Sequence, residues 1–132
     1  MRRLDNVLIV DDDSISNFIT ENVVRGTSPS AHTITVKDGR QALNFLRHQC
    51  DEEDFSCPDL IILDINMPLM DGVEFLEQYE RLKNTKKSTI VALSNSTFSE
   101  PLKETLKKRH VNSFIEKPLT AEKIMNVLEK LE

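Results

Sequence analysis

The chain has 132 residues, 39% of them apolar and 30% charged, which is the composition of an ordinary soluble domain with a substantial core. Its formal net charge of −5 argues against nucleic-acid binding, which normally uses a basic surface. No apolar stretch approaches the roughly 20 residues of a membrane span. Residues 1–5 lack the apolar segment of a secretory signal, so we expect a cytoplasmic protein with no membrane attachment.

The two cysteines, Cys50 and Cys57, flank an acidic segment. They do not form the CxxC spacing of metal sites or redox motifs. We therefore expect both thiols to be reduced, as is usual in a cytoplasm. The acidic segment between them is polar, and we expect it to be a solvated surface loop.

Five segments predict strands. Val7–Val10 and Leu60–Leu63 are continuous apolar runs, which is the pattern of strands buried on both faces of a parallel sheet. Thr33–Val36 alternates β-branched residues and predicts an edge strand. Two further strands are predicted at Thr89–Leu93 and Val111–Ile115.

A helix is predicted after each strand. Asp38 is a suitable cap for the second helix, and Ser99 for the fourth, which has Pro101 in its first turn. The other signal is apolar residues at helical spacing. These residues are Ile15, Phe18, Ile19 and Val23; Ala42, Leu43 and Leu46; Val73, Leu76, Tyr79 and Leu82; and Ile124, Val127, Leu128 and Leu131.

This alternation of strands and helices predicts an α/β fold. Repeated β–α units form a parallel sheet with helices on both faces and right-handed crossovers. No repeat, linker or change of composition divides the chain. We therefore expect a single domain over residues 1–132, with no output domain.

Four of the predicted strands end in polar residues. The first is followed by Asp11-Asp12-Asp13, the third by Asp64, the fourth by Ser94-Asn95-Ser96 and the fifth by Lys117-Pro118. Open parallel sheets carry their chemistry at this edge. Two carboxylates ~4 Å apart repel by about 4 kcal/mol at an effective dielectric constant of 20. A divalent cation would relieve that repulsion, and Mg²⁺ prefers oxygen ligands.

These side chains suit phosphoryl transfer. A carboxylate fixed at a strand end, such as Asp64, can act as a nucleophile toward phosphorus. Lys117 can place a positive charge on the transferred group, and Ser94 can donate a hydrogen bond to it. Positioning and charge neutralisation supply most of the catalysis in such reactions.

The chain resembles the receiver domain of two-component response regulators, the CheY-like family, from about Val7 to Leu131. The resemblance implies a doubly wound, flavodoxin-like fold with five strands in the order 2-1-3-4-5. The motifs that carry it are Val10-Asp11-Asp12, Leu63-Asp64-Ile65-Asn66-Met67-Pro68, Met70-Asp71-Gly72, Ser94, Phe114 and Lys117-Pro118.

The resemblance also implies a role for each acidic residue. Asp64 would accept a phosphoryl group from a sensor histidine kinase or a histidine phosphotransfer protein. Mg²⁺ would be the cofactor, bound by Asp11, Asp12, Asp64 and the backbone carbonyl of Asn66, with Asp11 acting largely through water. We expect the remaining carboxylate of the triplet, Asp13, to cap the first helix.

The same resemblance implies how the signal spreads. Lys117 would pair with the phosphoryl group, and Ser94 would move toward it. Phe114 would then rotate inward and change the face made by the fourth helix, fifth strand and fifth helix. The Lys117–Pro118 bond would be the cis peptide of the family. The receiver would bind a downstream target protein or pass the phosphate on in a relay.

Several positions are particular to this chain. Lys103, Lys107 and His110 follow helical spacing on the expected output face, where they could meet an acidic partner. Ser94 stands where many relatives have threonine. Whether phosphorylation produces a homodimer is an open question at this point. In the family, Asn66 and Ser96 occupy positions that tune dephosphorylation, and Asn95 is bulkier than the residue often found there, which would restrict access to Asp64.

Three other functions compete with this interpretation. A magnesium-dependent aspartyl phosphatase often has a second Asp, two residues after the nucleophile, as general acid. Here that position is Asn66, which cannot donate a proton in that way. A phosphate-independent interaction module would not need Asp12, Asp64, Ser94 and Lys117 together. A flavin-binding fold of the same architecture is not supported, because no Ser/Thr/Gly-rich phosphate loop follows the first strand of this chain. We expect no enzyme activity beyond self-phosphorylation and autodephosphorylation.

Overall fold

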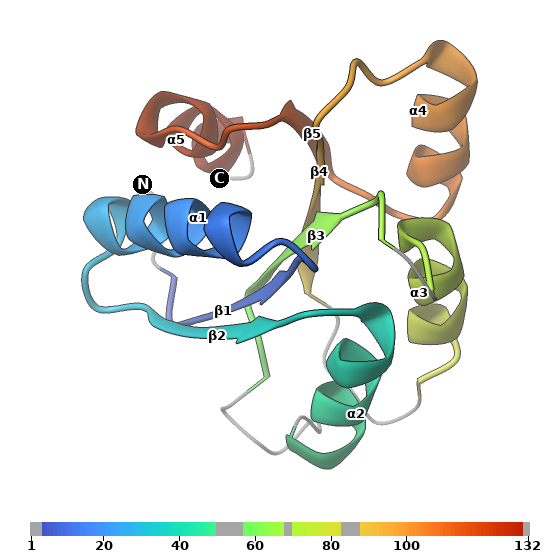
Figure 1. The fold of residues 1–132 in the computed structure, drawn as a ribbon, viewed down its shortest axis with the longest axis horizontal. Coiled ribbons are helices and arrows are strands. Elements are labelled where there is room, and N and C mark those ends of the chain that lie inside the picture. Colours follow the sequence, from blue (N-terminus) through green and yellow to red (C-terminus); the bar gives the residue numbers. More distant parts are fainter. Residues whose placement is uncertain (1–3, 50–56, 68–69, 83–87, 131–132) are drawn as a thin grey trace.

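The computed structural model describes residues 4–49, 57–67, 70–82 and 88–130, in which five strands alternate with five helices (Figure 1). None of the described helices has the length and apolar character to cross a membrane. The strands are β1 (Asn6–Val10), β2 (His32–Val36), β3 (Leu60–Asp64), β4 (Thr89–Ser94) and β5 (Ser113–Glu116). The helices are α1 (Ser14–Thr27), α2 (Gly39–Gln49), α3 (Gly72–Glu80), α4 (Glu100–Lys108) and α5 (Ala121–Lys130).

The strands form one parallel sheet in the order β2-β1-β3-β4-β5, which confirms the predicted topology and places β2 at an edge. Helices α1 and α5 cover one face, and α2, α3 and α4 cover the other (Figure 1). In the register, Leu63 of β3 pairs with Val10 of β1 and with Ala92 of β4. The carboxyl ends of the central strands therefore lie level with one another.

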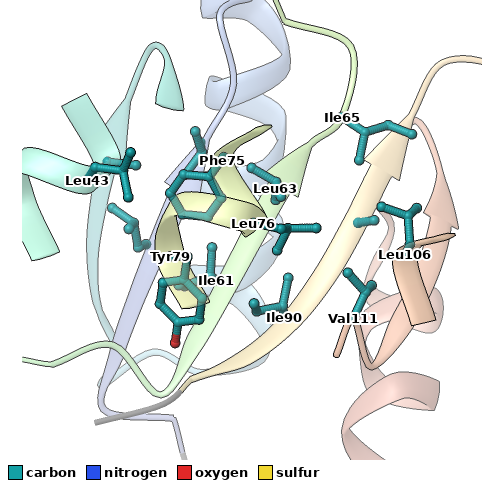
Figure 2. Packing of buried hydrophobic residues seen from close by; sticks show 14 of the residues in the cluster. Leu43, Ile61, Leu63, Ile65, Phe75, Leu76, Tyr79, Ile90, Leu106 and Val111 are labelled. Carbon is teal, nitrogen blue, oxygen red and sulfur yellow. The ribbon is translucent and has the colours of Figure 1, made fainter. Parts of the chain in front are cut away.

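Alternating side chains of the central strands fill two cores. Leu8 and Val10 face the α2–α3–α4 side, whereas Val7 and Ile9 face the α1–α5 side. Every residue of β3 is buried, as the continuous apolar run predicted. Figure 2 shows the first core, in which Phe75, Leu76 and Tyr79 of α3 lie over Ile61, Leu63 and Ile90 of the sheet.

The predicted helix caps are confirmed. Asp13 accepts hydrogen bonds from the backbone N–H groups of Ile15 (2.9 Å) and Ser16 (3.4 Å). Asp38 accepts one from Gln41 (2.8 Å), and Ser99 accepts one from Leu102 (3.3 Å). Each cap satisfies an N–H that has no partner within the helix. Asp13 thereby fixes the start of α1 directly after the acidic end of β1.

The fifth strand begins two residues later than predicted. His110 has a positive φ of 67°. Its N–H donates to the carbonyl of Lys107, and the N–H of Val111 donates to the carbonyl of Leu106. This is the Schellman arrangement that ends a helix. Val111 is therefore a buried residue of the α4 terminus, and β5 starts at Ser113. For the same reason His110 does not continue the predicted helical row of Lys103 and Lys107.

Helix α1 turns its most apolar side chains outward. Ile15 and Phe18 are 71% and 68% exposed and Ile19 is 39% exposed, whereas the buried residues of the helix are Asn17, Thr20 and Val24. The apolar spacing predicted the helix correctly, but periodicity alone does not say which neighbour the apolar face meets. Asn17 is held inside because its side-chain amide donates to the carbonyl of Asp11 at 2.7 Å.

The prediction of reduced thiols is wrong for Cys57, which is buried and disulfide-bonded. That prediction relied on the absence of a CxxC motif, a pattern that does not decide whether a buried sulfur is bonded. Several other predicted features lie outside the described residues. They are Cys50 and the acidic loop to residue 56, Pro68, and Leu131 of the last helix.

Candidate functional site

The carboxyl ends of β1, β3, β4 and β5 bring the predicted site residues together. Asp64 and Ser94 are the last residues of β3 and β4. Backbone bonds continue past the strands, from Ile65 N–H to Leu93 (3.1 Å) and from Lys117 N–H to the Ser94 carbonyl (2.8 Å). The sheet itself therefore sets the positions from which these side chains project. The bond between Lys117 and Pro118 is cis, as predicted.

Asp11 is fully buried at the end of β1 and is held by three donors. Its Oδ1 accepts the backbone N–H of Asp13 at 3.0 Å. Its Oδ2 accepts the Ser16 hydroxyl at 2.6 Å and the Lys117 ammonium at 2.9 Å. Burial raises the pKa of Asp11, but the hydrogen bonds from Ser16, Lys117 and Asp13 outweigh it and hold the pKa below its ordinary value. Asp11 is therefore a fixed negative charge.

Asp64 is also buried but is less well compensated. Its Oδ1 accepts the backbone N–H of Asn66 at 3.0 Å, and its Oδ2 lies 3.4 Å from the Lys117 ammonium. Burial raises the pKa of Asp64 to about 6, and the charge of Asp11 adds to the rise, although the Asn66 hydrogen bond and Lys117 oppose it. At neutral pH Asp64 is thus an ionised but poorly stabilised carboxylate.

Lys117 bridges the two buried carboxylates. Burial lowers the pKa of this lysine, but its contacts with Asp11 and Asp64 more than reverse that effect and leave the pKa above its ordinary value. The lysine is therefore charged. One positive charge shared between two carboxylates leaves the pocket negative, with Asp12 beside it adding a further carboxylate.

The pocket suits a magnesium ion. Carboxylate oxygens of Asp11, Asp12 and Asp64 all lie within 4.8 Å of one another. Two of these residues are buried, and Asp12 is exposed, so the group is open to water on one side. Mg²⁺ prefers such hard oxygen donors and usually keeps several waters. The donor set and its excess negative charge therefore fit the predicted cofactor.

The hydroxyl of Ser94, the predicted switch residue, belongs to a second network. Ser94 Oγ accepts a hydrogen bond from the side-chain amide of Asn66 at 3.0 Å and from the backbone N–H of Ser96 at 3.1 Å. Ser96 Oγ lies 3.2 Å away. Ser94 is buried, whereas Asn66 and Ser96 are exposed. The segments that follow β3 and β4 thus meet at one hydroxyl.

Sequence reasoning missed two contributors to the site. Ser16 and Asn17, in the first turn of α1, bind the side chain and the backbone carbonyl of Asp11. Both follow the Asp13 cap by three or four residues, which places them on the face of the first turn that can reach back to the end of β1. That spacing was the available signal.

The predicted aromatic switch, Phe114, lies away from the acidic pocket. It is half-buried on β5, and its ring lies 5.3 Å from that of Phe98, at an interplanar angle of 53°. Beside it is a groove of about 370 Å³ between α4, β5 and α5. Lys103, Lys123 and Lys130 are among the residues that line this groove, so the expected output face carries positive charge.

A doubly wound α/β fold with an acidic pocket and a lysine at its carboxyl edge defines a class of phosphoacceptor signalling modules. The family model of the response regulator receiver domain matches residues 7–129. The chain therefore belongs to this family, and it is a phosphoacceptor receiver of two-component signal transduction. Receivers of this family interact with histidine kinases or phosphotransfer proteins and use Mg²⁺ in an acidic pocket.

Individual relatives support the assignment. Two-component response regulator ARR22 of Arabidopsis thaliana is 32% identical over 130 residues, which is 98% of this chain and 85% of that protein. The probable methanogenesis regulatory protein FilR2 of Methanothrix harundinacea is 28% identical over 127 residues, which is 96% of this chain and 80% of that protein. A two-component response regulator from Cytophaga hutchinsonii superposes with a TM-score of 0.84 at 30% identity, covering 98% of both chains.

Proposed function

We propose that Asp64 is the residue that accepts the phosphoryl group. The observation that carries this proposal is the position of Asp64, a buried carboxylate 3.4 Å from a charged lysine and within 4.8 Å of two further carboxylates. Its pKa of about 6 leaves it ionised at neutral pH, as a nucleophile requires. Asp11, by contrast, accepts from three donors at 2.6–3.0 Å, whereas Asp64 has two contacts at 3.0 and 3.4 Å, so Asp11 is less available to attack.

In the proposed reaction a carboxylate oxygen of Asp64 attacks the phosphorus of a phosphohistidine. The P–N bond breaks, and its electron pair stays with the imidazole. Lys117 would move from the carboxylates to the incoming oxygens, and the Ser94 hydroxyl would donate a hydrogen bond to one of them. Mg²⁺, held by Asp11, Asp12, Asp64 and the Asn66 carbonyl, would neutralise charge on the phosphoryl oxygens. Asn66 has no acidic proton, so no turnover of external phosphate esters is proposed.

Intact-mass spectrometry tests the acceptor. Wild-type protein incubated with acetyl phosphate and Mg²⁺ is expected to gain one phosphoryl group, and Asp64→Asn is expected to gain none. Chelation of Mg²⁺ should strongly reduce labelling, because the acidic pocket would then repel the donor. Labelling of Asp64→Asn at the wild-type level would show that another carboxylate is the acceptor.

We further propose that the protein donating the phosphate docks on the apolar side of α1. Ile15, Phe18 and Ile19 form an exposed apolar patch there, of the kind that marks interaction sites. A depression of about 250 Å³ lined by Ile15, Ser16, Ile19 and Lys117 joins this patch to the acidic pocket. A donor whose apolar helical surface covers the patch would place its phosphohistidine at the pocket.

Phe18→Ala separates docking from chemistry. The phosphate donor is the phosphorylated histidine phosphotransfer protein that labels wild type fastest. Transfer from this donor to Phe18→Ala should be about tenfold slower, because an exposed aromatic anchor is lost. Labelling by acetyl phosphate should stay unchanged, since Phe18 is largely exposed and is not among the described residues that bind Asp11 or Asp64. Met125→Ala, which removes an exposed side chain from α5, is the control. Equal slowing with both donors would count against α1 as the docking surface.

For the output, we propose that phosphorylation alters the groove beside Phe114 and its lysines, which would bind an acidic downstream partner or a second phosphorylated copy. We also propose that residues 1–132 act as one cytoplasmic receiver unit. The family match over residues 7–129 supports the single unit. Onward transfer of the phosphate in a relay uses the same site.

A further inference from the structure

The three groups around Ser94 Oγ determine where its proton points. A serine hydroxyl has one proton to donate and two lone pairs that accept. The amide of Asn66 and the backbone N–H of Ser96 can only donate, and they lie 3.0 and 3.1 Å from the oxygen. Both lone pairs are therefore occupied. The remaining contact, with Ser96 Oγ at 3.2 Å, must use the proton of Ser94.

Ser94 therefore directs its only proton toward Ser96. To hydrogen-bond a phosphoryl oxygen on Asp64, it must withdraw that proton from the Ser96 hydroxyl. Breaking the hydrogen bond between Ser94 and Ser96 costs more free energy at Ser94 than at Ser96. Ser96 is exposed, so water can replace its partner, whereas Ser94 is buried and needs the phosphoryl oxygen to satisfy its proton.

We propose that the side chains of Ser96 and Asn66 form a latch that holds Ser94 in the unphosphorylated arrangement, with Ser96 taking the proton and Asn66 fixing the oxygen. The inference rests on the proposed role of Asp64 as phosphoacceptor. Ser96 and Asn66 are positioning residues, because they act on the phosphoryl group only through Ser94. Serine lacks the branching that restricts χ1 in threonine. The rotamer of Ser94 therefore depends more on these hydrogen bonds, which makes the latch effective.

The latch sets how readily the phosphorylated state forms. Loss of one neutral hydrogen bond at a partly exposed site corresponds to a change of about three- to tenfold in an equilibrium constant. Ser96→Ala removes the acceptor of the Ser94 proton in the unphosphorylated state only. It should therefore favour the phosphorylated arrangement by that factor, even though it removes a hydrogen bond.

The experiment measures the affinity of the full chain for beryllium trifluoride in the presence of Mg²⁺, by the rise in Tm with ligand concentration. Ser96→Ala is expected to bind about three- to tenfold more tightly than wild type. Ser96→Thr keeps the hydroxyl and should bind like wild type. Thr97→Ala is the matched control, because it removes a neighbouring exposed hydroxyl that has no hydrogen bond to any described residue.

The alternatives give distinct results. A merely structural role for Ser96 would lower the Tm of the free protein without tightening binding, and that result would overturn the latch. Affinity in Ser96→Ala equal to or weaker than in wild type would also overturn it. Failure of the acceptor assignment would appear differently, as equal binding of beryllium trifluoride by wild type and Asp64→Asn.

Discussion

Asp64→Asn is expected to raise the free energy of unfolding by about 2–3 kcal/mol at pH 7.5, while abolishing phosphorylation. The folded-state pKa of Asp64 is about 6, against an ordinary value of 3.8, mainly because the group is buried. The folded protein thus binds this proton more tightly than the unfolded chain does. The stabilising contribution of this group is fully present below about pH 4 and is lost as the pH rises through about 6, so the ionised carboxylate weakens the fold at neutral pH.

Urea denaturation at pH 7.5 and pH 4.5 tests this sign. Because asparagine resembles the protonated acid, its advantage should shrink to about 1 kcal/mol at pH 4.5. Glu104→Gln removes one charge from an exposed residue that has no ion pair with any described residue, and its stability should not change. Mg²⁺ should stabilise wild type more than Asp64→Asn, since ligands stabilise the state that binds them. An asparagine variant less stable than wild type at pH 7.5 would contradict the argument.

The fold could be predicted from the sequence because its local signals agree. The continuous run Leu60–Leu63 requires a strand buried on both faces, and the caps Asp13, Asp38 and Ser99 each mark a helix start. What escaped prediction depends on tertiary contact. No local sequence pattern shows that Phe18 faces solvent. Nor does one show that α4 ends at His110 with a positive φ, a conformation usually adopted by glycine.

The site likewise has features that the sequence predicts and features that depend on tertiary contact. Asp11, Asp64, Ser94 and Lys117 were identified because strand ends of a parallel sheet meet at one edge. Their roles in catalysis stay predictions. The contacts of Ser16 with Asp11 and of Asn66 with Ser94 were not identified, since they join side chains across loops and depend on rotamers. Sequence thus locates the charged groups, whereas the structure shows which hydrogen bonds restrain them.

Lys117→Met is expected to have the opposite effect to Asp64→Asn, lowering the free energy of unfolding by about 3 kcal/mol at pH 7.5 without Mg²⁺. Methionine retains much of the length of lysine but removes the charge that lies 2.9 Å from Asp11 and 3.4 Å from Asp64. Two buried carboxylates would then face each other uncompensated. Phosphorylation by acetyl phosphate should also fall strongly, because the incoming oxygens lose their cation.

Urea denaturation with and without Mg²⁺ separates this charge effect from lost packing. Mg²⁺ should recover much of the stability of Lys117→Met, and adding Asp64→Asn to it should recover stability without metal, because either change reduces the repulsion in the pocket. Lys123→Met is the control, since among the described residues Lys123 donates only to the backbone carbonyls of Glu116 and Pro118. If Lys117→Met were as stable as wild type without Mg²⁺, the bridging lysine would not be what holds the two carboxylates together.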